Sequence, residues 1–292
     1  MTFIKKIILL FCFLSIVSCD KSKIKDSKIK EQSIQKINSS SSPNVSILKD
    51  SFAVENLQGK LIYRKVWLYT PPNYKKSTES YPVVYMHDGQ NLFDKETSFV
   101  GEWGVDEILN SIFEKTGKGF IVVGIDNVGS ERTNEYSPWT HKKYGGGNGD
   151  RYLKMIVEEL KPMIDKNYRT KTKKEHTGII GSSMGGLISY YGGLKHPTVF
   201  GKIGVISPSF WFSENVLSYT KNQAKEADNK MFFLLGAEEG MTKEFNEVSN
   251  LLVESGFKKE SIYKKLVPGG KHNEAFWGSQ FEEVITWLYN IQ

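Results

Sequence analysis

The chain has 292 residues, of which 39% are hydrophobic and 13% aromatic, enough to bury one large core. The formal charge of +6 is concentrated at the N-terminal end, because residues 1–50 hold nine lysines against four acids and leave 30 basic and 29 acidic residues for 51–292. A nearly neutral folded part without a basic stripe excludes nucleic acid as a partner.

The first 19 residues have the pattern of an export signal. Lys5 and Lys6 precede an apolar run over 7–17 that is too short to span a bilayer, and Ser18 stands before Cys19. This order resembles a bacterial lipoprotein signal peptide with a lipobox ending at Cys19, which implies cleavage before Cys19 and its acylation. We therefore expect a lipid-anchored, extracytoplasmic protein of the bacterial cell envelope. In the alternative, an ordinary secretory signal, Cys19 is incidental.

The composition of the remaining N-terminal segment indicates a domain boundary near residue 50. Residues 20–50 are rich in Lys, Ser, Ile, Gln and Asn without an apolar face, which is typical of a flexible tether. We expect one catalytic domain over 51–292. The only cysteines are Cys12 and Cys19, so this domain has neither a disulfide nor a zinc–cysteine site.

The sequence pattern of this domain predicts strands that alternate with helices. Apolar runs and alternating patterns predict strands over 52–55, 60–69, 81–86, 120–126, 177–180, 202–206, 231–235 and 261–267, the first two as a hairpin. Helical spacing predicts helices over 103–114, 151–168 with a kink at Pro162, from 187 onward, 243–255 and 276–291. Residues 127–148 form a long irregular stretch, which in a compact domain is usually functional or mobile. This order predicts an α/β fold with a mainly parallel central sheet and helices on both faces.

A strand–turn–helix pattern surrounds Ser183 in the stretch 178–186, Gly-Ile-Ile-Gly-Ser-Ser-Met-Gly-Gly. Glycines at 181 and 185 permit a sharp turn that exposes the serine, as in the nucleophile elbow of an α/β-hydrolase. The backbone N–H of Met184, at the start of the following helix, is the expected first oxyanion donor. A tightly packed Gly-rich turn without chemistry is the alternative.

A serine nucleophile of this kind is followed along the chain by an acid and then by a histidine. His272 lies in a glycine-rich loop between the last strand and the last helix, and is the expected general base, whereas His196 ends the helix after the elbow. Glu238 and Glu239 follow the strand over 231–235, and either could orient the histidine.

The loop after the strand over 81–86 is expected to supply a second oxyanion donor, for which Gly89 favours the N–H of Gln90. His87 and Asp88 could also be read as metal ligands, but they lack further spaced partners and more simply form a strand-end turn. We expect no metal and no cofactor.

Five motifs in the same order resemble the esterase D-type family of α/β-hydrolases over 52–292. They are His87 to Phe93, Arg132 to Pro138, Gly181 to Gly185, Ser207 to Trp211 and Gly270 to Glu274. The second motif most resembles the branch with trilactone siderophore esterases. The resemblance implies that the acid is Glu239, three residues after Gly236. Gly240 supports this choice, because a glycine directly after Glu239 lets the backbone turn the carboxylate toward the His272 loop. It also implies a substrate site that includes Asp88, Arg132, Glu135, Tyr136 and Trp211. An Arg132–Glu135 ion pair that anchors the loop is the alternative for that element.

These residues predict a serine carboxylic ester hydrolase that acts through an acyl-enzyme on a siderophore-type or carbohydrate-linked ester. Acyl transfer to a sugar or another alcohol, and a catalytically idle binding module on the same scaffold, are the alternatives. The sequence does not indicate the oligomeric state.

Overall fold

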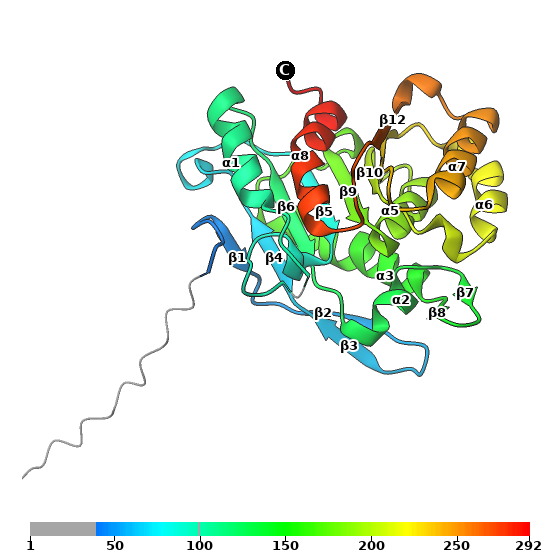
Figure 1. Cartoon of the computed structure of the whole chain (residues 1–292). Helices are drawn as coiled ribbons and strands as arrows, with labels where there is room; N and C mark the ends of the chain where they lie inside the picture. Colours follow the sequence, from blue (N-terminus) through cyan, green and yellow to red (C-terminus); the bar gives the residue numbers. More distant parts are fainter. Residues whose placement is uncertain (1–38, 99) are drawn as a thin grey trace, which may run out of the picture. The chain divides into compact units, whose positions relative to one another are not determined.

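The computed structural model describes residues 39–98 and 100–292 (Figure 1). The predicted signal peptide and Cys19 lie outside these residues. None of the helices in the described part of the chain has the length and apolar character needed to span a bilayer.

Eight strands form the central sheet in the order β1-β4-β6-β5-β9-β10-β11-β12. Every neighbouring pair from β6 to β12 is parallel, whereas β4 pairs antiparallel with both β1 and β6. The strands are β1 (Val45–Ile47), β4 (Val66–Tyr69), β5 (Val83–His87), β6 (Ile121–Ile125), β9 (Thr177–Ser182), β10 (Lys202–Ile206), β11 (Lys230–Gly236) and β12 (Ile262–Val267). The predicted α/β fold with a mainly parallel sheet is confirmed.

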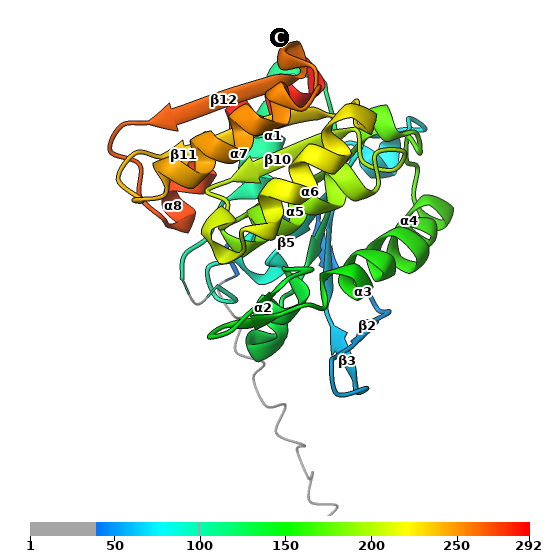
Figure 2. The ribbon, with the colours of Figure 1, turned by 90° about the vertical axis from the view of Figure 1, so that its right-hand side faces the viewer.

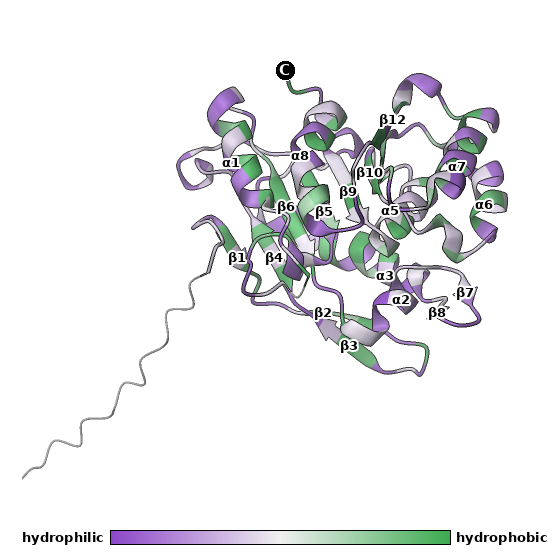
Figure 3. Ribbon diagram, in the orientation of Figure 1, coloured by the Kyte–Doolittle hydropathy of each residue, from purple (hydrophilic) through white to green (hydrophobic). Residues whose placement is uncertain are grey.

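Helices cover both faces of this sheet, as Figures 1 and 2 show from two sides. Alternate residues of the central strands point to opposite faces: Tyr85 packs in the cluster that includes α3 to α7, while Val84 and Met86 pack with α1 and α8. In Figure 3 the central strands are largely apolar, and polar residues occupy the outer faces of the helices. The helices are α1 (Val105–Thr116), α3 (Gly149–Lys154), α4 (Lys161–Asn167), α5 (Met184–Lys195), α6 (Asn215–Gln223), α7 (Thr242–Glu254) and α8 (Glu274–Tyr289).

The predicted second strand over 60–69 is divided between two sheets. Its first half, β3 (Leu61–Arg64), pairs with β2 (Phe52–Glu55) in the expected antiparallel hairpin, and its second half is β4 of the central sheet. Arg64 ends the hairpin with a buried side chain that pairs with Glu135, which fixes the chain where it changes direction.

The tether prediction is wrong for its last residues, because Val45–Ile47 forms the edge strand β1 beside β4. Three residues of mixed polarity carry too little periodicity for a sequence pattern to reveal the strand. The irregular stretch over 127–148 contains the short helix α2 (Arg132–Glu135) and a small hairpin of β7 (Thr140–His141) and β8 (Gly145–Gly146).

The helix predicted over 151–168 is present as α3, a π-helical turn over Met155–Leu160, and α4. Pro162 follows this turn at the start of α4 and has no N–H to donate, so the regular hydrogen-bond pattern of the helix is interrupted here.

Candidate active site

Four polar side chains meet beyond the carboxyl ends of adjacent parallel strands, the usual site edge of an α/β sheet. Ser183 follows β9, Ser207 follows β10, Glu239 follows β11 and His272 follows β12. The order of the strands therefore brings together residues up to 89 positions apart in the sequence.

Ser183 occupies the sharp turn between β9 and α5. Its backbone has φ 59° and ψ −123°, a conformation that a residue with a side chain rarely adopts, and its N–H donates to the carbonyl of Ile206 at 3.0 Å. A Cβ at Gly181 would lie 2.7 Å from the backbone of Gly185, so only glycine permits this close turn. The side chain of Ser183 is thereby held at the N-terminus of α5.

A chain of hydrogen bonds joins Ser183, His272 and Glu239. His272 Nδ1 lies 2.7 Å from Glu239 Oε2, and His272 Nε2 lies 3.0 Å from Ser183 Oγ. A carboxylate only accepts, so Nδ1 carries the hydrogen in the neutral ring and Nε2 is left to accept the hydroxyl proton of Ser183. The geometry is that of a nucleophile, a base and an orienting acid.

Glu239 is held in place by two further donors. Its side chain has no exposed surface, and its Oε1 accepts from the N–H of Gly236 at 2.8 Å and from the hydroxyl of Ser207 at 2.7 Å. Ser207 in turn accepts from the indole N–H of Trp277 at 2.9 Å. The neighbouring Glu238 is exposed, so the structure brings Glu239 to His272.

Ser207 and Trp277 are members of the site that the sequence did not reveal. Ser207 is fully buried with φ 44°, a left-handed conformation. Its place directly after β10, at the start of the motif Ser207 to Trp211, is the sequence signal that could have indicated its role. Trp277 also packs edge-on against the His272 ring, with centroids 4.9 Å apart.

Two loops approach closely so that the acid and the base can meet. A Cβ at Gly236 would lie 2.4 Å from the backbone of Gly270, so a side chain at this position would push the two loops apart. Packing between the loops therefore requires glycine at 270, whereas Gly269 has open space around it and a φ of 72°, which favours glycine.

The backbone N–H groups of Met184 and Gln90 donate no hydrogen bond to any other described residue. Met184 is the first residue of α5, where N–H groups point outward and the helix dipole favours negative charge. Gln90 follows Gly89, where a Cβ would lie 2.7 Å from the backbone of Gly124, so this loop packs tightly on β6. Both N–H groups are therefore free to donate to an oxyanion, as expected of oxyanion donors.

An ion pair holds the loop that carries Gln90. Arg132 Nε and Nη2 donate to the two carboxylate oxygens of Asp88 at 2.7 and 2.8 Å, and Asn127 donates to Oδ1 at 2.6 Å. Burial alone would raise the pKa of Asp88, but Arg132 and Asn127 outweigh it and lower that pKa below its ordinary value. Asp88 has φ 56°, so the ion pair fixes a residue in a strained conformation two positions before Gln90.

Glu135 and Tyr136 lie behind this loop, outside the pocket lining. Glu135 is fully buried and accepts from Arg64 at 2.9 Å, and the hydroxyl of Tyr136 accepts from the N–H of Asp88 at 3.1 Å. The prediction that they contact substrate is therefore corrected, because both side chains lie inside the protein, where Tyr136 supports the Asp88 loop and Glu135 pairs with Arg64. The alternative Arg132–Glu135 pair does not form either, since each residue has a different partner.

His87 belongs to the same buried support. Its Nδ1 lies 2.7 Å from the hydroxyl of Tyr152, and burial lowers its pKa to about 3, so the ring is neutral. Trp211, also expected at the substrate site, is 45% exposed beside Tyr144 and is not among the residues that line the pocket.

A pocket of about 950 Å³ opens beside Ser183 and His272. The large apolar side chains in its lining are Trp67, Val100 and Trp277, and aromatic side chains are typical of a site for a small organic group. Its charged lining consists of Lys65, Arg132, Asp88, Glu96, Asp126 and Glu274. Burial raises the pKa of Asp126 to about 6 and also raises that of Glu274. Asp88 and Arg132 neutralise each other, so the pocket keeps an excess of acidic groups.

Comparison with known proteins places this chain in a family. The sequence model of the family described as "Putative esterase" matches residues 63–288. YbbA, an uncharacterized protein of Bacillus subtilis (strain 168), is 31% identical over 242 residues, which are 77% of this chain and 92% of YbbA.

Two further proteins that resemble this chain, one in sequence and one in fold, have named activities. An endo-1,4-beta-xylanase/feruloyl esterase of Xylanibacter ruminicola is 27% identical over 228 residues, 76% of this chain but 29% of that protein. The crystal structure of the enterobactin esterase FES from Shigella flexneri in the presence of enterobactin superimposes with a TM-score of 0.68 at 20% identity, covering 86% of this chain and 60% of FES. Since the family match spans most of the described domain, this chain belongs to that esterase family and has its α/β-hydrolase fold.

Proposed function

We propose that this protein is a serine carboxylic ester hydrolase with Ser183, His272 and Glu239 as its catalytic triad. The observation that carries the proposal is the continuous hydrogen-bond chain of 3.0 and 2.7 Å from Ser183 through His272 to the buried Glu239. This chain opens into the pocket, where a substrate carbonyl can reach the nucleophile. A binding module would have no need for all three groups.

In the acylation step, Ser183 Oγ attacks the ester carbonyl while His272 Nε2 takes its proton. Glu239 stabilises the imidazolium that forms, and the N–H groups of Met184 and Gln90 hold the negative oxygen of the tetrahedral intermediate. The C–O bond to the alcohol then breaks, and His272 returns the proton to the leaving alcohol. Ser183 remains acylated.

In the deacylation step, His272 removes a proton from a water molecule that attacks the acyl-enzyme, and the acid leaves. An alcohol in place of water would yield a new ester, which is the acyltransferase alternative. Adding acceptor sugars at constant ester concentration separates the two activities, because a transferase gives a transesterified product whereas a hydrolase gives only the free acid.

The pocket charge favours one of the two expected substrate groups. Beyond the Asp88–Arg132 pair, only Lys65 opposes Glu96, Asp126 and Glu274. An acidic pocket repels a highly anionic ferric catecholate and accepts a neutral ester. We therefore propose a neutral, carbohydrate-linked ester, such as a feruloyl ester, as the preferred substrate, which agrees with the activity named for the Xylanibacter relative.

The test compares kcat/KM for methyl ferulate, acetylated xylan, p-nitrophenyl esters, and an iron-free and a ferric catecholate trilactone, with Ser183→Ala as the blank. We expect hydrolysis of the neutral esters, with methyl ferulate preferred over the ferric trilactone. A preference for the ferric trilactone would overturn the substrate assignment and leave the esterase assignment intact. If no ester were hydrolysed, the function itself would be refuted.

We also propose that Cys19 anchors the protein to a bacterial membrane from the extracytoplasmic side. The proposal is supported by the basic residues, the short apolar run and the small residue before Cys19. In detergent phase separation, the wild type should enter the detergent phase and Cys19→Ser the aqueous phase. Equal partition of the two proteins would show that Cys19 is incidental.

A further inference from the structure

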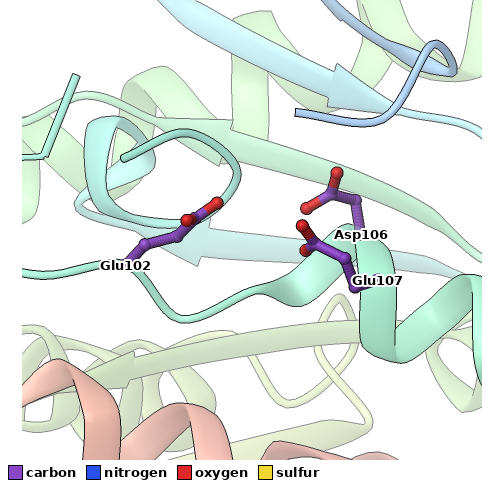
Figure 4. Close-up of side chains that lie close together, drawn as sticks. All are labelled: Glu102, Asp106 and Glu107. Carbon is purple, nitrogen blue, oxygen red and sulfur yellow. The ribbon is translucent and has the colours of Figure 1, made fainter. Parts of the chain in front are cut away.

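Three carboxyl groups gather beside the start of α1, outside the residues of the proposed triad. Glu102 lies in the loop before the helix, and Asp106 and Glu107 belong to its first turn (Figure 4). One oxygen from each of the three lies within 4.8 Å of the others. Like charges at this spacing repel each other unless a proton or a cation lies between them.

The helix dipole explains only part of this arrangement. Acidic residues are favoured in the first turn of a helix, which accounts for Asp106 and Glu107 but not for Glu102. No lysine, arginine or histidine in the described part of the chain forms a salt bridge with any of the three.

Asp106 supplies an independent indication of a missing partner. Its side chain is fully buried, and Oδ2 accepts from the N–H of Ser42 at 2.6 Å. Its second oxygen, Oδ1, is buried and has no hydrogen-bond partner among the described residues. Figure 4 shows an oxygen of Asp106 directed toward the carboxyl group of Glu107. A buried carboxylate oxygen without a donor is costly, so this oxygen points to a ligand.

We propose that Glu102, Asp106 and Glu107 bind a calcium ion. The donor set consists only of carboxylate oxygens, which hard divalent cations prefer and which Zn²⁺ and softer metals do not select. Glu107 is exposed and Glu102 is partly exposed, so water can complete the six to eight oxygen ligands that Ca²⁺ takes. Flexible glutamates and water suit Ca²⁺ better than Mg²⁺, which demands a stricter octahedral geometry.

The bound ion would join three segments of the chain. Glu102 belongs to the loop whose Thr97 and Val100 line the pocket, while Asp106 and Glu107 belong to α1. The hydroxyl of Ser40 donates to Glu102 at 3.2 Å, so the first described residues are held at the same place. The ion therefore has a structural role, separate from the proposed triad.

The test is calorimetric titration of Ca²⁺ into the EDTA-treated protein at pH 8, with thermal unfolding in parallel. The variants are Glu102→Gln and Glu107→Gln, each of which removes one charge and nearly preserves shape. The matched control is Glu114→Gln, an exposed glutamate on the same helix. Circular dichroism in EDTA establishes that each variant is folded before titration.

We expect one Ca²⁺ per wild-type chain and a rise in Tm of roughly 5 to 10 °C at a hundredfold excess over Kd. Glu114→Gln should keep both effects, and either ligand variant should lose at least tenfold in affinity. Absence of binding at millimolar Ca²⁺, or equal binding by all four proteins, would overturn the proposal. The measurement requires no ester hydrolysis, so its outcome is independent of the proposed enzymatic function.

Discussion

Replacement of Ser207 by alanine tests whether the buried acid is held by its neighbours. The change removes the hydroxyl that donates to Glu239 at 2.7 Å and accepts from Trp277 at 2.9 Å. A hydrogen bond to a charged group contributes about 1.5–3 kcal/mol, and an unsatisfied buried indole N–H costs about 1–3 kcal/mol. Because these effects overlap at one atom, we expect the free energy of unfolding to fall by about 2–4 kcal/mol.

The same change should slow catalysis without abolishing it, because Glu239 keeps the N–H of Gly236 as a donor. If the weaker hold on Glu239 removes about 1.5–3 kcal/mol of transition-state stabilisation, kcat/KM falls roughly ten- to hundredfold. Urea unfolding and initial rates with a p-nitrophenyl ester measure the two effects separately.

Ser189→Ala is the matched control for this experiment. Ser189 is also a fully buried serine, but its hydroxyl has no hydrogen-bond partner in the described part of the chain. Its removal should change stability and rate little. Wild-type stability and activity in Ser207→Ala would refute the assigned role of Ser207, and equal losses in both variants would indicate a general packing effect.

Three further changes address the acid, the loop clamp and the pocket charge. Glu239→Gln should lower the hydrolysis rate by roughly three to four orders of magnitude, and the exposed Glu238→Gln should leave most of it; the reverse result would move the acid by one residue. Arg132→Lys cannot form the bidentate pair with Asp88, so kcat should fall about tenfold through the loop that carries an oxyanion donor. A rise in KM alone would instead make Arg132 a substrate-binding residue. Burial raises the pKa of Asp126 to about 6, so ionisation of Asp126 between pH 4 and pH 8 destabilises the folded state. The free energy of unfolding of Asp126→Asn, measured relative to that of the wild type, should therefore rise by about 2 kcal/mol from pH 4 to pH 8. A difference between the two proteins that does not change with pH would contradict this prediction.

The parallel strands of the central sheet and the three proposed triad residues were accessible from the sequence for a physical reason. Continuous apolar runs mark parallel strands buried on both faces, and parallel strands place their carboxyl ends at one edge of the sheet. Ser183 and Glu239 each follow such a strand, and His272 follows the parallel edge strand β12, so their meeting is a consequence of topology. The choice of Glu239 over Glu238 rested on the family resemblance, and the structure places Glu239 beside His272.

The parts that the sequence did not reveal depend on the direction of single side chains. Glu135 and Tyr136 lie in a motif near the pocket, but both point inward, and no periodicity in a short loop helix distinguishes the two directions. Ser207 acts through a contact with Glu239 from a different strand end, which exists only after the sheet is assembled. The edge strand β1 was missed because its pairing with β4 is decided by tertiary contacts.

The most direct test of the central claim is covalent labelling of the nucleophile with a fluorophosphonate, followed by peptide mass spectrometry. We expect one adduct per chain, located on Ser183, that is absent in Ser183→Ala and forms at least a hundredfold more slowly in His272→Ala. Absence of labelling in a folded wild type, or an adduct on Ser182, would contradict the account.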